Sequence, residues 1–341
     1  MTRWSVLDLV PVREGGTLRE SFAASRDLAV AAEEAGCHRF WVAEHHAMDG
    51  VAGGAASVAL AAIGAATSTI RIGSGGIMLP NHTPFQIAEQ FGTLDALYPG
   101  RVDLGLGRAP GAGPALQRAL RKDLAAAAGR FGDDVLELRA LLTGDIDLPV
   151  VATPGLGAQV ELWMLGSSLH GASLAARLGL PYAFASHFAP AQLDEALELY
   201  RREFTPSAAL DAPRVMVAMN LFCADTREAA ETLASSQWQA FAALRSGTPG
   251  RLPRPVPDYL DTLPPALRAM FAPLKEVSAI GTPDTVASAV RSFCARTRAD
   301  EVIFAGATWD AQARIASLRL AMDALREASL PAPSNTRAAA A

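Results

Sequence analysis

The chain has 341 residues, 50% of them hydrophobic, and a formal net charge of −5, which argues against a protein that binds nucleic acid or acidic membranes. This length fits two ordinary domains or one large barrel with insertions. Three widely spaced cysteines without a CxxC pair, no signal-peptide pattern and no membrane-spanning run of bulky apolar residues predict a soluble cytoplasmic protein without disulfides.

Strand-like segments alternate with helix-like segments along almost the whole chain, which predicts a parallel sheet with crossover helices. The predicted strands, eight in number, are Ser5–Val10, Arg39–Ala43, Ile70–Met78, Val102–Gly107, Glu161–Leu165, Tyr182–Ser186, Val215–Cys223 and Glu301–Ala305. The predicted helices are Leu18–Ala35, Ala55–Thr67, Pro84–Leu97, Ala115–Leu142, Leu169–Leu178, Ala191–Phe204 and Thr226–Leu244. We therefore expect a single (β/α)8 TIM-barrel domain over residues 1–330 and a disordered tail over residues 331–341.

One segment, Gly247–Glu276, interrupts this alternation after the seventh predicted strand. It is rich in proline, and proline does not support long regular elements. Barrel enzymes often carry lids on the loops at the carboxyl ends of their strands. The segment is therefore either a lid over an active site or a passive surface excursion.

The fourth predicted strand ends in Gly105 and Gly107, and Arg108 follows directly. Glycines let a backbone approach a ligand closely, and an arginine supplies a fixed positive charge that suits a phosphate. A dinucleotide-binding fold is disfavoured, because the glycine spacing misses the GxGxxG pattern and no acidic residue closes a following strand about 20 residues later. The alternative role for Arg108 is a structural ion pair at the barrel mouth.

The second predicted strand ends in Glu44-His45-His46. Adjacent strand residues point to opposite faces, so only one of the two histidines can face a site. No matching HxxE or HxH pattern accompanies them, so we predict no metal. We predict that His45 is a hydrogen-bond donor or acid/base at the rim, and that Glu44 orients it or completes the inner barrel layer. Alternatively, His45 caps the strand and Glu44 pairs with a barrel cation.

Two further segments have the composition of ligand-binding backbone. Gly75 and Gly76 lie within the third predicted strand, where paired glycines mark either a bend in the barrel wall or the close approach of a flat ring. Ser167 and Ser168 follow the fifth strand and open a helix, where hydroxyls and free N–H groups suit an anion, although N-capping explains the serines equally well. Because Arg108 follows the adjacent strand, we favour a phosphate here.

Taken together, these motifs resemble the bacterial luciferase-like flavin monooxygenases, which are (β/α)8 barrels that bind FMN. The resemblance extends from Ser5 to about Leu325. It rests on the order and spacing of Phe40–His46, Arg71–Pro80, Gly105–Arg108, Leu165–Ser168 and Ala279–Pro283. Two positions depart from luciferase itself: Gly107 stands where it has a reactive cysteine, and Ser167 where it has an acidic residue. Thiol chemistry is therefore not expected here.

The resemblance implies a role for each candidate residue. His45, with Glu44 beside it, would lie next to the flavin and act near the oxygen chemistry. Gly75 and Gly76 match the position where many family members carry a non-prolyl cis peptide that supports the flavin ring. The FMN phosphate would be bound by Arg108, Ser167, Ser168 and the backbone at Gly171.

The resemblance further implies an FMN-dependent monooxygenase. Reduced FMN from a separate reductase would react with O2 to form a C4a-peroxyflavin, which oxygenates a small organic substrate. We expect an apolar substrate, because the predicted pocket residues are Leu9, Met78, Phe184, Phe188 and Trp309. The alternatives are a deazaflavin-dependent hydride-transfer enzyme and a non-catalytic flavin-binding protein. Family members are often dimers, so we expect a homodimer.

Overall fold

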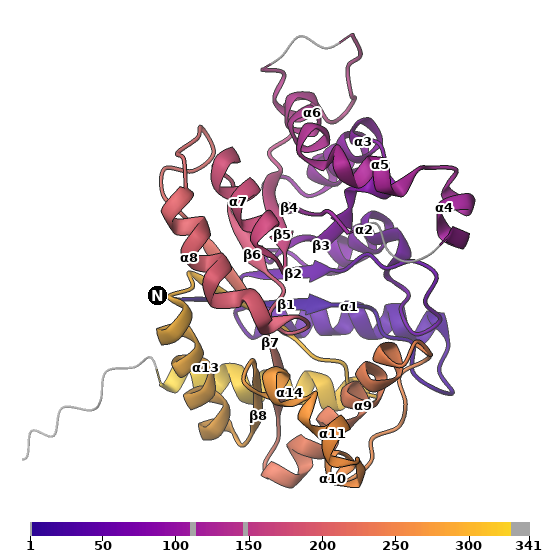
Figure 1. Cartoon of the computed structure of the whole chain (residues 1–341), viewed down its shortest axis with the longest axis vertical. Coiled ribbons are helices and arrows are strands. Elements are labelled where there is room, and N and C mark those ends of the chain that lie inside the picture. The colour runs from indigo at the N-terminus through magenta and orange to yellow at the C-terminus, as the bar shows by residue number, and fades with distance from the viewer. Residues whose placement is uncertain (1, 110–113, 146–148, 329–341) are drawn as a thin grey trace, which may run out of the picture.

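The structure is a computed structural model and describes residues 2–109, 114–145 and 149–328, so the predicted tail lies outside the described residues. Its parallel strands form a closed ring in which β6 pairs with β7 and β9 pairs with β1, and helices surround this ring (Figure 1). The predicted TIM barrel is confirmed. The ring consists of β1 (Arg3–Asp8), β2 (Arg39–Val42), β3 (Arg71–Met78), β4 (Val102–Gly107), β5 (Glu161–Gly166), β6 (Tyr182–Phe184), β7 (Val215–Cys223) and β9 (Glu301–Ala305).

An additional strand, β8 (Ser278–Gly281), lies outside the ring and pairs with the end of β7, from Asn220 to Cys223. The sequence prediction of only eight strands was therefore wrong. The additional strand has four residues and leads directly into a helix that begins at Pro283. A run of this length carries too little hydrophobic alternation to be distinguished from a loop.

The helices lie close to their predicted positions, with one exception. The single helix predicted over Ala115–Leu142 is instead three helices, because the Asp123 side chain accepts hydrogen bonds from the N–H groups of Ala125 and Ala126 and starts a new helix. Within the described ranges, no helix has both the length and the apolar character needed to cross a membrane. The helices are α1 (Leu18–Glu34), α2 (Ala56–Ala66), α3 (Pro84–Leu97), α4 (Pro114–Leu120), α5 (Leu124–Gly129), α6 (Phe131–Thr143), α7 (Leu169–Leu178), α8 (Leu193–Glu203), α9 (Arg227–Arg245), α13 (Pro283–Thr297) and α14 (Ala311–Glu327).

Apolar side chains form one cluster inside the barrel and another between its strands and the surrounding helices. Phe184 belongs to the larger cluster, between the strands and the helices, so the prediction that it lines the substrate pocket was wrong. Residues two apart in a strand share a face, and Ala183 is the β6 residue that points inward. The interior cluster consists of Leu7, Trp41, Ala43, Trp163, Ala183, Met216, Ala218, Ile303 and Ala305, with Leu9 and Leu165 packed against it.

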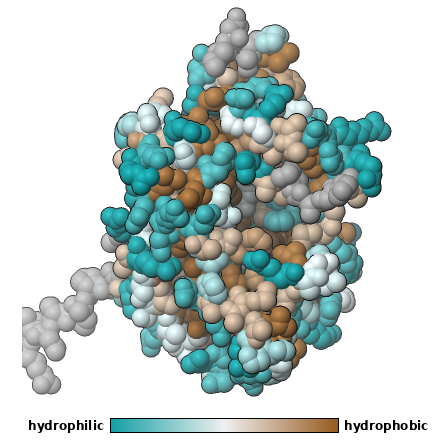
Figure 2. All heavy atoms as spheres, in the orientation of Figure 1, coloured by the Kyte–Doolittle hydropathy of each residue, from teal (hydrophilic) through white to brown (hydrophobic). Residues whose placement is uncertain are grey.

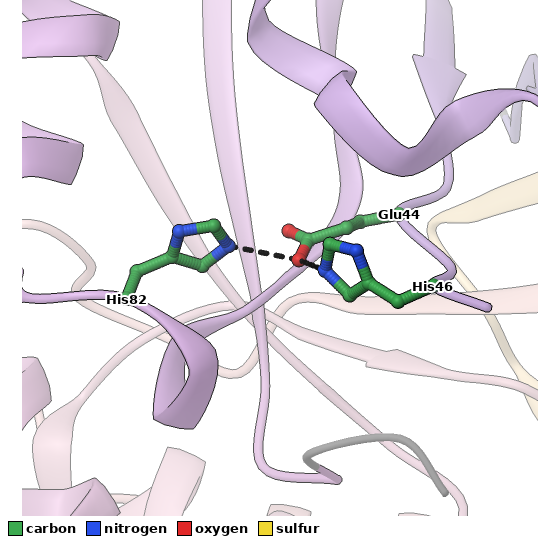
Figure 3. Close-up of side chains that lie close together, drawn as sticks. All are labelled: Glu44, His46 and His82. Carbon is green, nitrogen blue, oxygen red and sulfur yellow. Dashed lines mark hydrogen bonds and ion pairs between the residues drawn. The ribbon is translucent and has the colours of Figure 1, made fainter. Parts of the chain in front are cut away.

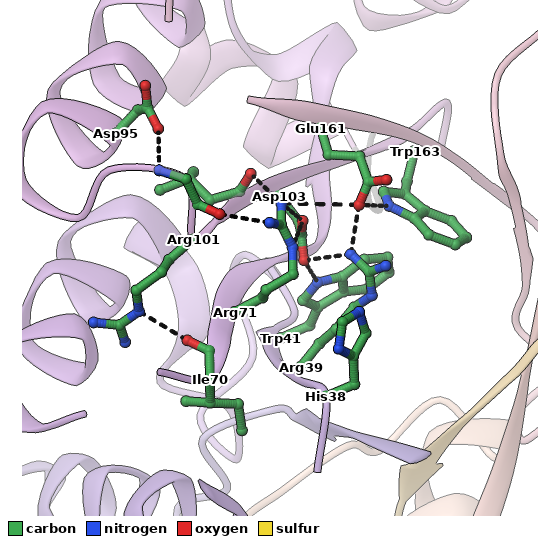
Figure 4. A network of polar contacts seen from close by, with 12 residues as sticks. His38, Arg39, Trp41, Ile70, Arg71, Asp95, Arg101, Asp103, Glu161 and Trp163 are labelled. Atoms are coloured by element: carbon green, nitrogen blue, oxygen red, sulfur yellow. Dashed lines mark hydrogen bonds and ion pairs between the residues drawn. The ribbon is translucent and has the colours of Figure 1, made fainter. Parts of the chain in front are cut away.

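A network of buried charges occupies the amino-terminal end of the barrel (Figure 4). The Arg39 guanidinium, at the start of β2, lies 2.8 Å from Asp103, 2.6 Å from Glu161 and 2.9 Å from Glu301. The indole N–H of Trp41 donates a hydrogen bond of 2.9 Å to Asp103. Ion pairs in a nearly dry environment fix the register of the four strands that supply them. The chemistry predicted from the sequence lies at the opposite end of the same strands.

The proline-rich segment lies against loops at the carboxyl ends of the strands. Leu252 pairs with the chain after β1, through its N–H to the Val12 carbonyl and its carbonyl to the Glu14 N–H, both at 2.9 Å. Arg251 donates to Asp49, after β2, at 2.9 Å. The segment then forms α10 (Tyr259–Thr262), α11 (Pro265–Ala269) and α12 (Ala272–Lys275). In the space-filling view, apolar residues surround a recess near the middle of the visible face (Figure 2).

Candidate active site

The paired glycines of β3 form a half-buried stretch of backbone without side chains in the barrel wall. The peptide bond between Gly75 and Gly76 is cis, at the position where the family resemblance predicted it. A Cβ atom on Gly75 would lie 2.6 Å from Leu7 Cδ1, and one on Gly76 would lie 2.7 Å from the Gly105 carbonyl oxygen. No side chain fits at either position. Packing against the neighbouring strands therefore requires glycine here, whether or not a ligand binds.

Two histidines at the ends of β2 and β6 have unsatisfied ring nitrogens. Nδ1 of His45 and Nδ1 of His187 are buried and have no hydrogen-bond partner in the described parts of the chain. Burial lowers the pKa of His45, and burial together with the nearby His45 lowers the pKa of His187 to about 4. Both rings are therefore neutral at pH 7, and each presents one free polar atom.

The amino end of α7 is open and lies near Arg108. Arg108 is exposed and forms no ion pair with any described residue. Gly107 at the end of β4 pairs with Leu165 of β5, so Arg108 and the start of α7 follow adjacent strands. Burial and, after it, the charge of Arg108 lower the pKa of His170 in the first turn of α7. Ser168 occupies the N-cap position, but its side chain does not cap the helix. A hydroxyl, an unpaired cation and first-turn N–H groups thus lie together, as a phosphate site requires.

The remaining predicted members of this site share that location. Ser167 precedes the N-cap residue, and its hydroxyl has no partner within the described ranges. Gly171 lies in the first turn of α7. A Cβ atom on it would come no closer than 3.4 Å to its nearest neighbour, Gly166 Cα. The predicted phosphate-binding residues therefore all follow the ends of two adjacent strands, β4 and β5. Pro110 and Gly111, which the sequence placed in the preceding turn, lie outside the described residues.

Glu44 does not hydrogen-bond to His45, so the prediction that it orients this ring is not supported. Its Oε1 atom accepts hydrogen bonds from Nε2 of His46 and, at 2.8 Å, from Nε2 of His82, while Oε2 accepts from the Met78 N–H at 3.1 Å. Its backbone N–H donates to the Gly76 carbonyl at 3.3 Å. Glu44 thus ties the loop after β2 to the end of β3.

His82 was missed in the sequence analysis. It follows a single 3-10 turn, η2 (Leu79–Asn81), directly after β3. The signal that identified the other candidates, polar residues at the ends of neighbouring parallel strands, also applies to His82. A metal-ligand spacing within one segment does not include His82, because a whole βα unit separates it from Glu44.

A cavity of about 350 Å³ lies beside the barrel wall, between α1 and the start of α14. Trp309 lines this cavity, with the guanidinium carbons of Arg13 and Arg254 at 4.5 and 4.3 Å from its ring centroid. Its indole N–H donates to the Glu14 carbonyl at 3.2 Å. Trp309 is therefore held between Arg13 and Arg254 at the wall of this cavity.

Comparisons with known proteins agree with this architecture. The family model described as luciferase-like monooxygenase matches residues 2–301. A luciferase-like monooxygenase of Escherichia coli (strain K12) is 46% identical over 325 residues, which cover 95% of this chain and 97% of the relative. N-acetyl-S-alkylcysteine monooxygenase of Bacillus subtilis (strain 168) is 35% identical over 253 residues, or 72% of this chain and 75% of the relative.

Solved structures extend the comparison. The structure of apo-MsnO8 aligns with a TM-score of 0.84 at 34% identity and covers 96% of this chain and 99% of that chain. The same fold occurs in an FMN complex of 3,6-diketocamphane monooxygenase from Pseudomonas putida (17% identity, TM-score 0.69, 97% and 100% covered). It also occurs in an F420-dependent secondary alcohol dehydrogenase (15% identity, TM-score 0.68, 95% and 99% covered). The family match and the two curated relatives together establish that this chain belongs to the luciferase-like monooxygenase family.

Proposed function

We propose that this chain is an FMN-dependent monooxygenase that uses reduced FMN and O2 to oxygenate a small apolar organic substrate. The observation that carries the proposal is that Arg108, which has no ion-pair partner among the described residues, and the amino end of α7, which Ser168 does not cap, follow the adjacent strand ends of β4 and β5. Strand β4 also pairs with β3, which contains the side-chain-free Gly75–Gly76 backbone. A phosphate and a flat ring joined by a short chain match these two features.

The reaction would consume the reduced FMN anion, O2, substrate and one proton, and would yield oxidised FMN, the oxygenated substrate and water. The chain's own groups bind, orient and exclude water. Gly75 and Gly76 would contact the flavin ring, and Nδ1 of His45 would hold or donate a proton beside it. His187, the second neutral imidazole with a free Nδ1 atom, would contact the substrate. Glu44 would position the loop that carries His45.

The proline-rich segment and further proteins complete the proposal. Residues 247–276 would close over the barrel mouth and keep water from the reacting oxygen, because Arg251 and Leu252 attach the segment to loops after β1 and β2. A separate flavin reductase would supply reduced FMN. The active form would be a homodimer in the cytoplasm.

A deazaflavin-dependent hydride-transfer reaction is the second candidate, because an F420-dependent dehydrogenase shares this fold. The same phosphate site would serve either cofactor. Parallel titrations with reduced FMN and reduced F420 distinguish the two, since the proposal expects clear selectivity for FMN. Preference for F420 would favour the dehydrogenase. Tight FMN binding without turnover of any substrate would favour a flavin carrier.

Arg108→Ala is expected to weaken the binding of reduced FMN roughly 10- to 100-fold, because a charge-assisted hydrogen bond to phosphate contributes about 1.5–3 kcal/mol. Anaerobic fluorescence titration measures the dissociation constant. Riboflavin, which lacks the phosphate, should bind the variant and the parent protein equally. Arg19→Ala, at an exposed position in α1, is the matched control. An unchanged FMN dissociation constant in Arg108→Ala would remove the arginine from the site.

His45→Ala is expected to retain FMN binding but to reduce the yield of oxygenated product about 100-fold, because general acid–base groups contribute about this much. Rapid mixing of the reduced complex with O2 is followed by absorbance. The parent protein should form a long-lived species absorbing to the blue of oxidised FMN. The variant should return directly to oxidised FMN and release hydrogen peroxide.

His38→Ala is the control for this experiment, since His38 lies before β2 at the other end of the barrel and interacts with Arg3. A parent protein that forms no long-lived species would count against the monooxygenase proposal as a whole. A His45→Ala variant with full product yield would instead remove only the role assigned to His45.

A further inference from the structure

We propose that Glu44, His46 and His82 form a binding site for one divalent transition-metal ion, with Zn²⁺ as the best match. Figure 3 shows the three side chains converging from two loops, with the Glu44 carboxylate between the two imidazole rings. Their ligand atoms, Oε1 and two Nε2 atoms, all lie within 4.8 Å of one another. None of the three is assigned to FMN or substrate, so the inference does not rest on the proposed function.

The donor set has the chemistry of a zinc site. Two imidazole nitrogens and one carboxylate oxygen are the protein ligands of several catalytic zinc ions, which keep the fourth position open for water. Two nitrogen ligands make the site a poor one for Mg²⁺ or Ca²⁺, which prefer an all-oxygen shell. The geometry points to zinc or another late first-row metal.

Metal binding requires only small movements of these side chains. Ligand atoms about 2.0–2.1 Å from a tetrahedral metal lie about 3.3 Å from each other. The His82 Nε2 atom is 2.8 Å from Glu44 Oε1, so the His82 ring would move outward by about half an ångström. The His46 ring lies closer to the carboxylate and would move somewhat further. In a neutral ring the Nε2 proton moves to Nδ1 when the metal takes its place, so each histidine exchanges one hydrogen bond for one metal bond.

Glu44 is already prepared for a cation. Its side chain is 1% exposed, and its second oxygen is held by the Met78 N–H. Its first oxygen accepts hydrogen bonds from both imidazole rings, so the carboxyl group faces only hydrogen-bond donors, which favours its ionised form. An ionised carboxylate in a water-poor position is stabilised by a divalent ion on its open side.

The two histidines provide access and an anchored third ligand. The His46 and His82 side chains are 18% and 24% exposed, so an ion can enter between them. The Lys122 ammonium group donates a hydrogen bond to the His82 carbonyl oxygen and thereby fixes the backbone of this ligand. The positive charge of Lys122 repels a metal cation, so metal binding depends on the strength of the bonds between the metal and the imidazole nitrogens.

The test uses the full-length, tag-free chain after removal of metals with EDTA, and needs no flavin. Calorimetric titration with Zn²⁺ is expected to show one ion per chain. Titration with Co²⁺ is expected to produce visible d–d absorption without an intense thiolate-to-cobalt band. His82→Ala should weaken Zn²⁺ affinity by roughly 100-fold or more, since loss of even an outer hydrogen-bond partner costs 10- to 100-fold.

His46→Gln tests the same site from the other loop and should weaken Zn²⁺ binding comparably. His170→Ala, a histidine in α7 outside the cluster, is the matched control and should bind one Zn²⁺ as tightly as the parent. No stoichiometric Zn²⁺ binding by the parent protein would overturn the proposal. Equal affinity in His82→Ala, or a thiolate-to-cobalt band that assigns the ion to a cysteine, would also overturn it.

Discussion

Replacing Arg39 with methionine is expected to lower the free energy of unfolding by about 3–5 kcal/mol at neutral pH, measured by chemical denaturation. Arg39 is 1% exposed and pairs with Asp103, Glu161 and Glu301 at 2.6 to 2.9 Å. Methionine fills much of the volume but leaves the buried Glu301 without a cation, whereas Asp103 keeps its ion pair with Arg71 and Glu161 keeps its ion pair with Arg214. An unpaired buried charge costs far more than the loss of an exposed ion pair.

The deficit of Arg39→Met should depend on pH. Burial raises the pKa of Glu301 above its usual 4.5, and Arg39 opposes this shift, so removing Arg39 raises the pKa further. A carboxyl group with a raised folded-state pKa contributes stability below its unfolded pKa and loses it as the pH rises through the folded value. The variant should therefore be least destabilised near pH 4.5 and below, and most destabilised at neutral pH.

Two further variants test this explanation. Adding Glu301→Gln to Arg39→Met removes an uncompensated charge and should recover part of the lost stability at neutral pH, which a double-mutant cycle measures. Arg26→Met removes an exposed arginine whose ion-pair partner, within the described part of the chain, is Asp27 alone, and it should change stability by less than about 0.5 kcal/mol. Similar losses for Arg39→Met and Arg26→Met would contradict the role assigned to the network.

Gly105→Ala is expected to cost about 3 kcal/mol or to prevent folding. A Cβ atom at this position would lie 2.3 Å from the Ser74 carbonyl oxygen and 2.6 Å from Leu165 Cδ1. Backbone cannot move aside without separating β3 from β4, and overpacking of this kind typically costs about 1–3 kcal/mol even where side chains can adjust. The displaced Ser74 precedes the Gly75–Gly76 peptide, so any folded variant should also bind FMN more weakly.

Gly107→Ala, two residues further along the same strand, is the matched control. Its Cβ atom would meet only the Ile77 carbonyl oxygen, at 3.6 Å, which is an ordinary contact. Thermal or chemical unfolding should therefore separate the two alanine variants clearly. If both unfold at the same midpoint as the parent protein, close strand packing is not the reason for glycine at position 105.

The strand ends were the part of the candidate site that could be predicted without a structure. In a parallel barrel every carboxyl end faces one rim, so Arg108 and Ser168 had to lie on the same side once their strands were recognised. The partners of each side chain could not be predicted in this way. Glu44 interacts with His46 and His82 instead of His45, because the chain turns after β2 ends at Val42 and the strand alternation no longer applies.

The sequence by itself determined the alternation of strands and helices, the barrel and the family, because hydrophobic periodicity and motif order are local properties. It did not determine β8, whose four residues become a strand only by pairing with β7. The charge network around Arg39 and the convergence of His82 on Glu44 were likewise decided by tertiary structure. Glu44 and His82 meet because β2 and β3 are neighbours in the sheet, whereas Arg39 reaches Glu161 and Glu301 only because the barrel closes.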